Sequence, residues 1–421
     1  MKFGNSREYD LSFLSCQTPF AITFLCISFY FKGTRFLEAC AAAGNTVYLL
    51  TKKSLEDSPW PRASLKDVFY LEDDANTPKN YEEMRKGIAW LLQENKVDRI
   101  VALDDFDVEK AAYLREEFRI PGMGQTTARY FRDKLAMRIK ARDAGIPVPP
   151  FSALFNNEEI NEYAATVAPP WVVKPRAEAS ALGIKKVHSA EDLWKVVNEL
   201  GEKRNNYLVE QFLPGDVYHV DVISSEGEIT FCQVSKYLNT PFEVAHGGGI
   251  FRSQTVPYKG VEDEGLRKLT GDVMKAFGMK FSASHTEFIR SHADGHFYFL
   301  ETSSRVGGAH LAEMVEYASG INLWAEWAKL ETAVAKDETY ELPTVRKHHA
   351  GILISLARYE HPDTSGFQDP EIVWRINKPH HVGFIVQSTS RERVTELLDS
   401  YAERVFNEFH ASAPAPDKPT D

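Results

Sequence analysis

FSASHTEFIRSHADGHFYFLETSSRVGGAH, residues 281–310, is the most informative stretch of this chain. Within it, two runs of alternating apolar and polar residues flank the short segment 293–295, which reads Ala-Asp-Gly. This pattern predicts a β-hairpin whose glycine takes the left-handed turn position. If these three residues form the loop, Glu287 and Glu301 lie directly opposite each other on one face of the hairpin.

The other hairpin residues divide between the two faces because strand side chains alternate. Beside the acids, this register places His285 opposite Ser303 and Ala283 opposite Arg305. Three apolar residues are expected to share that face, which makes it too apolar to be a plain wet surface: Ile289, Phe297 and Phe299. The opposite face should carry Thr286, Phe288, Leu300 and Thr302.

Two facing carboxylates repel each other, by about 3 kcal/mol at a separation of about 5 Å and an effective dielectric constant of about 20. A shared proton, an arginine or a divalent cation must offset this repulsion. Oxygen ligands with hydroxyl groups nearby suit Mg²⁺, which binds proteins through one or two carboxylates plus substrate phosphates. Two alternatives remain: a solvated ladder in which Arg305 neutralises one acid, or a two-residue loop, which would put the acids on opposite faces.

Composition is that of an ordinary globular protein. The chain has 421 residues, of which 43% are hydrophobic and 26% charged, enough for two or three domains with real cores. A net charge of −11 argues against a nucleic-acid partner or an anionic membrane surface. The cysteines lie in apolar surroundings without metal-like spacing, which favours buried thiols and a reducing, cytoplasmic compartment: Cys16, Cys26, Cys40 and Cys232.

The apolar segment 11–31 invites interpretation as a signal peptide, which stays an alternative. Acidic residues precede it and Gln-Thr-Pro interrupts it at 17–19, so we expect a disordered or accessory start up to about Pro19 and a buried strand after it.

Strands and helices then alternate, which predicts a small doubly wound parallel α/β domain. The expected strands are 21–29, 46–50 and 99–103, and the expected helices 33–43, 81–93 and 108–118. Asp104 and Asp105 follow the last strand and either line the crevice at the strand ends or, as we favour, cap a helix. No Gly-x-Gly-x-x-Gly follows the first strand, so a dinucleotide cofactor has little support.

Cations and small residues cluster in the next unit. A helix is expected over 133–144, with Lys134 in its first turn; from this helix alone, that lysine is an ordinary solvated one. A short strand then ends in Lys174 and Arg176, before an Ala/Ser/Gly loop at 177–183. Point charges beside backbone N–H groups suit a polyphosphate, although the loop fits a plain strand connection equally well and lacks P-loop spacing.

The segments on either side of the hairpin are less specific. The strand 207–213 could hold a flat base or be an edge strand. His-Gly-Gly-Gly at 246–249 lacks a Gly-x-Ser-x-Gly partner, so we interpret it as a mobile loop lining an acceptor pocket. A helix over 307–319 is expected to begin with N–H groups available to an anion. The C-terminal layer should be antiparallel, with strands at 349–359, 371–376 and 381–387, a helix at 391–409 and a disordered tail at 411–421.

In order and spacing, these motifs resemble those of the ATP-grasp ligases over about residues 21–331. The segments that carry the resemblance are Asp133-Lys134, the Val-Val-Lys174-Pro strand, Val-Glu210-Gln-Phe-Leu213-Pro-Gly, His285-Thr-Glu287-Phe and Glu301-Thr-Ser303-Ser-Arg305-Val-Gly-Gly. The chain looks most like the carboxylate–amine branch that makes dipeptides, and it is also similar to biotin carboxylases.

The resemblance implies a mixed α/β and α+β fold. It consists of a small N-terminal parallel α/β domain, a two-lobed ATP-grasp fold and a C-terminal antiparallel layer. The expected divisions are an N-terminal domain at 1–131, a small ATP-binding lobe at 132–206, a large lobe at 207–410 and the tail at 411–421.

The resemblance also implies ATP and Mg²⁺ (or Mn²⁺) as cofactors and assigns roles to individual residues. Phosphate contacts would come from Lys134, Lys174, Arg176 and Ser180. Adenine would lie against Glu210, Gln211, Phe212 and Leu213. The metal ligands would be Glu287, Glu301 and Ser303, and the catalytic residues Arg305, Lys174 and His285. Arg305 would stabilise charge on the transferred phosphoryl group, while His285 would accept the amine's proton, contact a carboxylate or be a satisfied strand histidine.

Two positions depart from the family pattern. Ser303 stands where a metal-binding asparagine is usual and can leave a water in its place. Val217 stands where an acid normally holds the ribose, so Asp216 takes over this contact or the contact is absent.

The implied reaction is amide-bond formation between a small carboxylate and an amine, both expected to be amino acids, through an acyl phosphate. The alternatives are a bicarbonate-using carboxylase and a regulatory protein that binds nucleotide without turnover. No motif fixes the substrates or the oligomeric state, for which a homodimer is one option.

Overall fold

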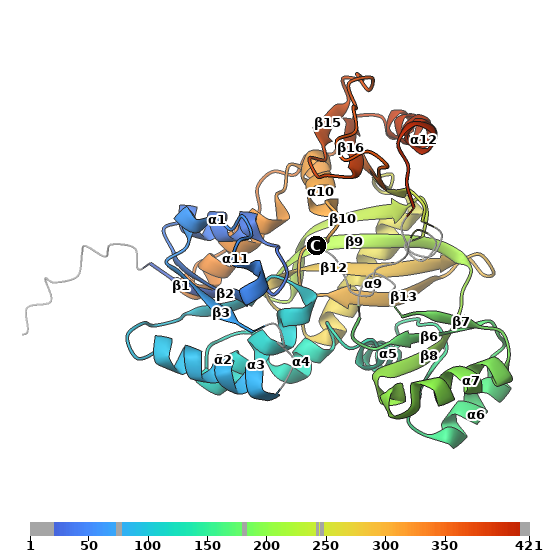
Figure 1. The fold of residues 1–421 in the computed structure, drawn as a ribbon, viewed down its shortest axis with the longest axis horizontal. Coiled ribbons are helices and arrows are strands. Elements are labelled where there is room, and N and C mark those ends of the chain that lie inside the picture. Colours follow the sequence, from blue (N-terminus) through green and yellow to red (C-terminus); the bar gives the residue numbers. More distant parts are fainter. Residues whose placement is uncertain (1–20, 73–77, 179–182, 241–243, 245–247, 413–421) are drawn as a thin grey trace, which may run out of the picture.

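The computed structural model describes residues 21–72, 78–178, 183–240, 244 and 248–412. They form three sheets: a parallel one in the N-terminal unit, an antiparallel one in a small lobe, and a long antiparallel one between them (Figure 1). The expected fold class, mixed α/β and α+β, is confirmed. The expected accessory start before Pro19 and the tail from 413 onward lie outside the described residues.

The N-terminal sheet has the order β3-β2-β1-β4 and all its strands are parallel. β1 is central and almost wholly buried because its sequence, TFLCI, has apolar side chains on both faces. The strands are β1 (Thr23–Ile27), β2 (Thr46–Lys52), β3 (Asp67–Leu71) and β4 (Arg99–Ala102). The helices of this unit are α1 (Thr34–Ala42), α2 (Pro78–Leu91) and α3 (Val108–Phe118).

One helix from much later in the chain completes this unit. α11 (Leu323–Lys336) packs against α1, with the rings of Phe36 and Trp327 5.0 Å apart between centroids. Figure 1 shows this helix beside the N-terminal sheet, although in sequence it lies between β13 and β14, two strands of the large sheet. The large sheet is therefore joined to the N-terminal unit by packing as well as by the chain.

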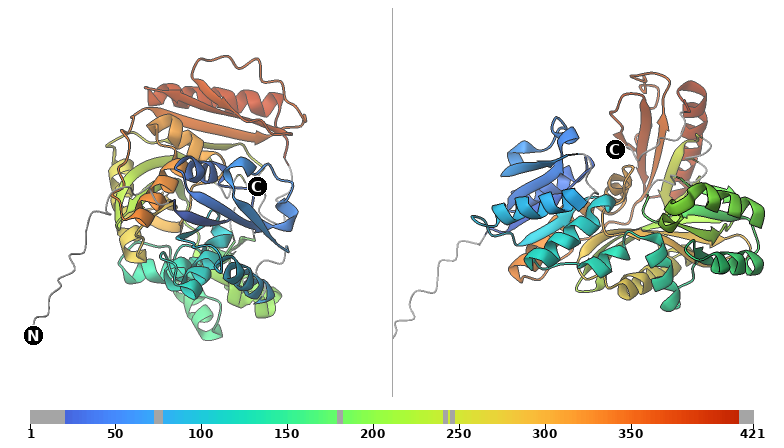
Figure 2. Two further views of the ribbon diagram at one scale, coloured as in Figure 1. Left: turned by 90° about the vertical axis from the view of Figure 1, so that its left-hand side faces the viewer. Right: turned by 60° about the horizontal axis from the view of Figure 1, so that its bottom comes forward.

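The small lobe is an antiparallel sheet of order β5-β8-β6-β7, with two helices packed on it (Figure 2). Its strands are β5 (Phe151–Ala153), β6 (Trp171–Pro175), β7 (Lys185–Val187) and β8 (Tyr207–Gln211). Its helices are α6 (Asn157–Thr166) and α7 (Ala190–Leu200), and α4 (Gln125–Arg129) and α5 (Lys134–Asp143) lead into the lobe. Asp133 caps α5, as expected: its carboxylate accepts from the backbone N–H of Leu135.

The large sheet has the order β13-β12-β9-β10-β11-β14-β16-β15. Its strands are β9 (Gly215–Ser225), β10 (Glu228–Tyr237), β11 (Phe251–Thr255), β12 (Ser282–Ser291), β13 (Phe297–Ser303), β14 (His349–Leu356), β15 (Ile372–Arg375) and β16 (His381–Ser388). Separate apolar cores join it to α9 (Val261–Phe277), α10 (Leu311–Ser319) and α12 (Arg391–Glu408). The expected C-terminal antiparallel layer is confirmed by β14, β15 and β16.

The hairpin register is confirmed at the acids: Glu287 pairs with Glu301, and His285 with Ser303. It is reached differently from the prediction, because a β-bulge falls between Glu287 and Phe288, so that two residues of β13 face one of β12. Nearer the turn, the backbone N–H of Ser291 donates to the carbonyl of His296, so the loop has one residue more than expected.

The bulge also changes which apolar residues lie beside the acids. Phe299 pairs with Phe288 in the core under α9, and Phe297 packs against that core, so the prediction that these two phenylalanines share the acid face is wrong. Leu300 and Tyr298 pack instead with Ile289 in the core under α10. The extra bulge residue shifts the alternation of β13 by one position, which exchanges its two faces.

Two further expectations can be compared with the structure. α10 begins at Leu311 rather than Gly307, because Ala309 and His310 take left-handed backbone angles (φ 51° and 57°) that a helix excludes. Cys26, Cys40 and Cys232 are buried free thiols, as expected; Cys16 lies outside the described residues. Among the helices described, none is long and apolar enough to cross a membrane.

Candidate functional site

The two facing acids are held by different partners. The phenolic O–H of Tyr237 on β10 donates to Oε1 of Glu287 at 2.9 Å, and Nε2 of His285 lies 3.6 Å from the same oxygen. Glu301 pairs instead with Nζ of Lys134 at 2.7 Å. The first turn of α5 therefore lies beside the end of β13. Lys134, which was expected to bind phosphate, contacts Glu301, which was expected to bind the metal.

A buried group of two imidazoles and one carboxylate lies beside the acids. β9 pairs with β12 so that Asp221 lies opposite His285, and His219 opposite Glu287. Nδ1 of His285 is 2.8 Å from one oxygen of Asp221, and Nδ1 of His219 is 2.9 Å from the other. Burial alone would lower the pKa of His285, but the Asp221 carboxylate raises it to about 9, whereas burial lowers the pKa of His219.

The backbone at Gly307 packs closely against Asp221 and His285 of this buried group. A Cβ atom on Gly307 would come within 2.9 Å of both Oδ1 of Asp221 and Nδ1 of His285. Only glycine permits this approach, so the turn between β13 and α10 buttresses the His285–Asp221 pair.

The cations of the small lobe form a second buried cluster. Glu210 on β8 accepts a hydrogen bond from Lys174 on β6 and one from Nε of Arg138 on α5 at 3.0 Å, and Nη2 of Arg138 forms an ion pair with it at 2.9 Å. Burial lowers the pKa of Lys174 to about 8, although the nearby carboxylate opposes the shift. Arg138 also donates to the carbonyl of Leu300, the bulge residue next to Glu301. The cluster thus connects the small lobe to the hairpin.

The other expected nucleotide contacts lie around this cluster. Arg176 pairs with Asp133 at the start of α5, and Nε2 of Gln211 donates to the carbonyl of Ala168 at 3.1 Å. Nζ of Lys186 lies 3.6 Å from the ring centroid of Phe212. Leu213 packs at the edge of the core under α10, and Asp216 pairs with Lys236 at 2.8 Å. Ser180 and the first two residues of the His-Gly-Gly-Gly segment lie outside the described residues.

Arg305 binds an acid from the N-terminal unit. Its Nη2 lies 2.6 Å from Oδ2 of Asp105, and both side chains are largely buried. Burial raises the pKa of Asp105, but the Arg305 guanidinium outweighs this and holds it well below its ordinary value. Both Asp104 and Asp105 were expected to cap a helix. Asp104 does cap the turn, because its carboxylate accepts a hydrogen bond from the backbone N–H of Phe106. Asp105 instead pairs with Arg305, so the prediction for it was wrong.

Several residues of the site were not found from the sequence. Only tertiary pairing brings them to the acids, and no motif marks them: Tyr237, Arg138, Asp221 and His219. Asp221 and His219 could have been found from the sequence. The alternation in Tyr-His219-Val-Asp221-Val places both polar side chains on one face of an otherwise apolar strand.

The residues at the hairpin fit a divalent cation. Two carboxylates share one face, and the hydroxyl-bearing Ser303 is two residues beyond Glu301 on β13. The side chains of Glu287 and Glu301 keep 17% and 33% of their exposure, so an ion can reach both. An all-oxygen donor set of this kind suits Mg²⁺ or Mn²⁺.

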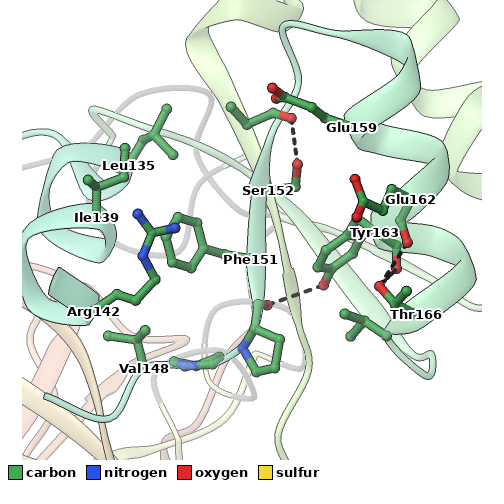
Figure 3. Close-up of a pocket in the computed structure, with 14 residues that line it drawn as sticks. Leu135, Ile139, Arg142, Val148, Phe151, Ser152, Glu159, Glu162, Tyr163 and Thr166 are labelled. Carbon is green, nitrogen blue, oxygen red and sulfur yellow. Dashed lines mark hydrogen bonds between the residues drawn. The ribbon is translucent and has the colours of Figure 1, made fainter. Parts of the chain in front are cut away.

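A hollow on the outside of the small lobe is separate from this site. It has a volume of about 710 Å³ and lies between α5 and α6 (Figure 3). Tyr163 in its wall donates to the carbonyl of Pro150 at 3.3 Å. None of the residues assigned above to nucleotide, metal or catalysis lines it.

Comparison with known proteins agrees with the class of protein that this fold and site define. The chain has the fold of the ATP-grasp ligases, and the resemblance to their carboxylate–amine branch is confirmed. The family model for the C-terminal part of D-Ala–D-Ala ligase matches residues 141–242, which include Lys174 and Glu210 but end before the hairpin acids.

Among individual proteins, the L-arginine-specific L-amino acid ligase of Bacillus subtilis is 31% identical over 280 residues, covering 64% of this chain and 65% of that protein. The D-alanine–D-alanine ligase of Neisseria meningitidis is 24% identical, over 44% of this chain and 61% of that protein. The chain thus spans less than two thirds of either relative.

Solved structures are similar over a larger share of the chain. The L-amino acid ligase of Bacillus licheniformis matches with a TM-score of 0.73 and 18% identity, over 92% of this chain and 98% of that one. N5-carboxyaminoimidazole synthetase of Staphylococcus aureus, complexed with ADP, matches with a TM-score of 0.70 and 16% identity, over 91% and 97%. At these identities the likeness is one of fold.

Proposed function

We propose that this protein is an ATP- and Mg²⁺-dependent ligase that joins the carboxylate of one α-amino acid to the amine of another. The observation that carries the proposal is the pairing of Glu287 with Glu301, with Lys134 on the second acid. These groups are a metal site and a phosphate site in contact. The proposal keeps the domain divisions expected above with one correction: the small ATP-binding lobe extends beyond 206 to Gln211, because β8 (Tyr207–Gln211) is a strand of its sheet.

Each charged group of the proposed site is paired with a group of opposite charge on the protein. Lys134 pairs with Glu301, Lys174 with Glu210, and Arg305 with Asp105. Nucleotide phosphates would take Lys134 from Glu301 and so free that carboxylate for the metal. In this exchange the Lys134–Glu301 ion pair is replaced by a Lys134–phosphate pair and a Glu301–metal pair. A highly charged ligand can therefore bind without leaving a buried charge unpaired.

In the proposed reaction a carboxylate attacks the γ-phosphate of ATP to give an acyl phosphate and ADP, and an amine then displaces phosphate to give an amide with loss of a proton. Glu287 and Glu301 would hold Mg²⁺, which would neutralise negative charge on the phosphates. Lys134 and Lys174 would hold the phosphates, and Arg305 would stabilise the transferred group. We assign His285 a positioning role: Asp221 fixes its ring by Nδ1 and leaves Nε2 directed at Glu287.

The Arg305–Asp105 pair supports an α-amino acid as the substrate that is phosphorylated. An α-amino acid carries a carboxylate and an ammonium group on one carbon, and this pair offers a cation and an anion side by side. Oδ1 of Asp105 and Nε of Arg305 are buried without a hydrogen-bond partner among the described residues. Arg305 would take the carboxylate and Asp105 the ammonium group, which satisfies both atoms.

The experiment is a measurement of ADP release by the purified chain with Mg²⁺ and pairs of L-amino acids, including arginine because of the B. subtilis relative. Release that requires a carboxylate and an amine together, with a dipeptide as product, supports the proposal. Release with bicarbonate and no amine would show a carboxylase instead. ATP binding without turnover on any pair would show a regulatory protein.

The Asp105 assignment is tested by comparing alanine with propionate, which lacks the ammonium group. In the Asp105→Asn variant, kcat/KM for alanine should fall by at least tenfold more than for propionate. An equal loss for both substrates would show that Asp105 only orients Arg305.

A further inference from the structure

A second cavity lies where the N-terminal unit meets the large sheet. It has a volume of about 390 Å³, near the lower end of the range for small-molecule sites. Its walls come from β4, α3, the turn before α4, the start of β12 and one side of α11. None of the residues assigned above to nucleotide, metal or catalysis lines this cavity.

Positive charge dominates its walls. The charged residues that line it are Arg99, Arg115, Lys280 and Glu331, so three cations face one carboxylate and leave an excess of two positive charges. That carboxylate is already engaged: it accepts from Nε of Arg99 at 2.7 Å and from Nε1 of Trp327 at 3.2 Å. It is only 3% exposed, so it cannot turn toward another cation without breaking these bonds.

Neither Arg115 nor Lys280 forms an ion pair among the described residues, and Arg115 is the less exposed of the two. Its Nε and Nη2 donate to the carbonyl of Ile100, and its Nη1 to that of Met123 at 3.1 Å. A guanidinium has five N–H groups, so these three contacts leave two. Among the described residues it forms no ion pair, and burial lowers its pKa to about 10. The Glu331 carboxylate opposes this shift without contacting Arg115, so the guanidinium is partly buried and lacks a direct anionic partner among the described residues, although such charges are normally paired.

We propose that this cavity binds a small oxyanion, a carboxylate or a phosphate, through the two remaining N–H groups of Arg115. A planar guanidinium suits both because it can donate two parallel hydrogen bonds. The hydroxyl-bearing residues Thr127 and Ser282, also in the wall, would supply further contacts. The bound anion would join α3 and α4 of the N-terminal part to the start of β12, and so tie the N-terminal unit to the large sheet. The site does not depend on the proposed ligase activity.

The test is to titrate the full-length protein with inorganic phosphate, and separately with acetate, at constant ionic strength. Calorimetry measures the binding, and thermal denaturation measures the stability that each anion adds. Arg115→Gln should weaken binding at least tenfold. Arg119→Gln is the matched control, because this arginine lies at the exposed C-terminal end of the same helix, and it should bind like the wild type. Binding of phosphate alone, or of acetate as well, distinguishes the two kinds of oxyanion.

Two further variants distinguish anion binding in this cavity from anion binding at the proposed ligase site. Arg305→Met removes the cation that would bind the substrate carboxylate and the transferred phosphoryl group at the proposed ligase site, and the effect of phosphate should persist in it. Thr127→Glu places a carboxylate in the cavity, so it should raise the denaturation temperature without added anion and abolish the anion's effect. The proposal is overturned if neither anion binds the wild type, if Arg115→Gln binds as well as the wild type, or if Arg305→Met abolishes binding.

Discussion

The buried cluster of Lys174, Glu210 and Arg138 makes a sharp prediction about stability. Their exposures are 7%, 4% and 0%, so all three charges are removed from water. Glu210→Gln leaves two buried cations without their common anion, which should cost about 3–5 kcal/mol. Lys174→Met leaves Glu210 with its hydrogen bond from Nε of Arg138 and its ion pair with Nη2, and it removes a buried charge, so its cost should be about 1 kcal/mol.

The assay is thermal denaturation of both variants with and without ATP and Mg²⁺. At about 2.1 cal/mol/K of unfolding entropy per residue, a difference of about 2–4 kcal/mol corresponds to about 2–5 °C in denaturation temperature for a chain of this length, with Glu210→Gln the less stable variant. ATP should raise the temperature of the wild type but have little effect on Lys174→Met, because the phosphates lose a cation. Equal destabilisation of the two variants would refute the charge argument, and full ATP stabilisation of Lys174→Met would refute the role of this lysine.

Three other outcomes follow from the site. Because burial lowers the pKa of Lys174 to about 8, this lysine loses its charge as the pH rises through 8. The Kd of the wild type for ATP should therefore not change with pH below pH 7 and should rise up to tenfold per pH unit above pH 8. The Kd of Lys174→Met should not change with pH over this range. Gly307→Ala should lower kcat by at least tenfold by pushing on Asp221, whereas Gly308→Ala, whose Cβ would meet nothing within 4 Å, should not; equal activities would contradict this. Ser303→Asn should lower the Mg²⁺ concentration for half-maximal ADP release, and an unchanged value would show that this side chain is not a ligand.

The sequence predicted those parts of the fold that rest on local patterns. The helix 108–118 matches α3 at both ends, because its apolar spacing, its preceding acids and the residue after it all agree. The facing of Glu287 and Glu301 also follows from alternation. The hairpin loop, however, was predicted one residue too short, and the bulge at Leu300 compensated for this error at the acids.

The parts that were missed depend on contacts between distant segments. Tyr237 reaches Glu287 only because β10 pairs with β9, and β9 with β12. Asp105 looked like a helix cap because its neighbours in sequence permit that role, yet its partner Arg305 is 200 residues away. Local spacing carries no information on such pairs, so they could not be derived from one sequence.

The most direct test of a metal shared by the two hairpin acids is calorimetric titration of ATP at several Mg²⁺ concentrations. Glu287→Gln and Glu301→Gln should each abolish most of the gain in affinity that Mg²⁺ gives the wild type. The matched control is Thr286→Val with Thr302→Val, the buried hydroxyl pair 2.7 Å apart that points to the other face of the same strands, and it should retain this gain. Undiminished Mg²⁺ dependence in both glutamine variants would contradict the proposed site.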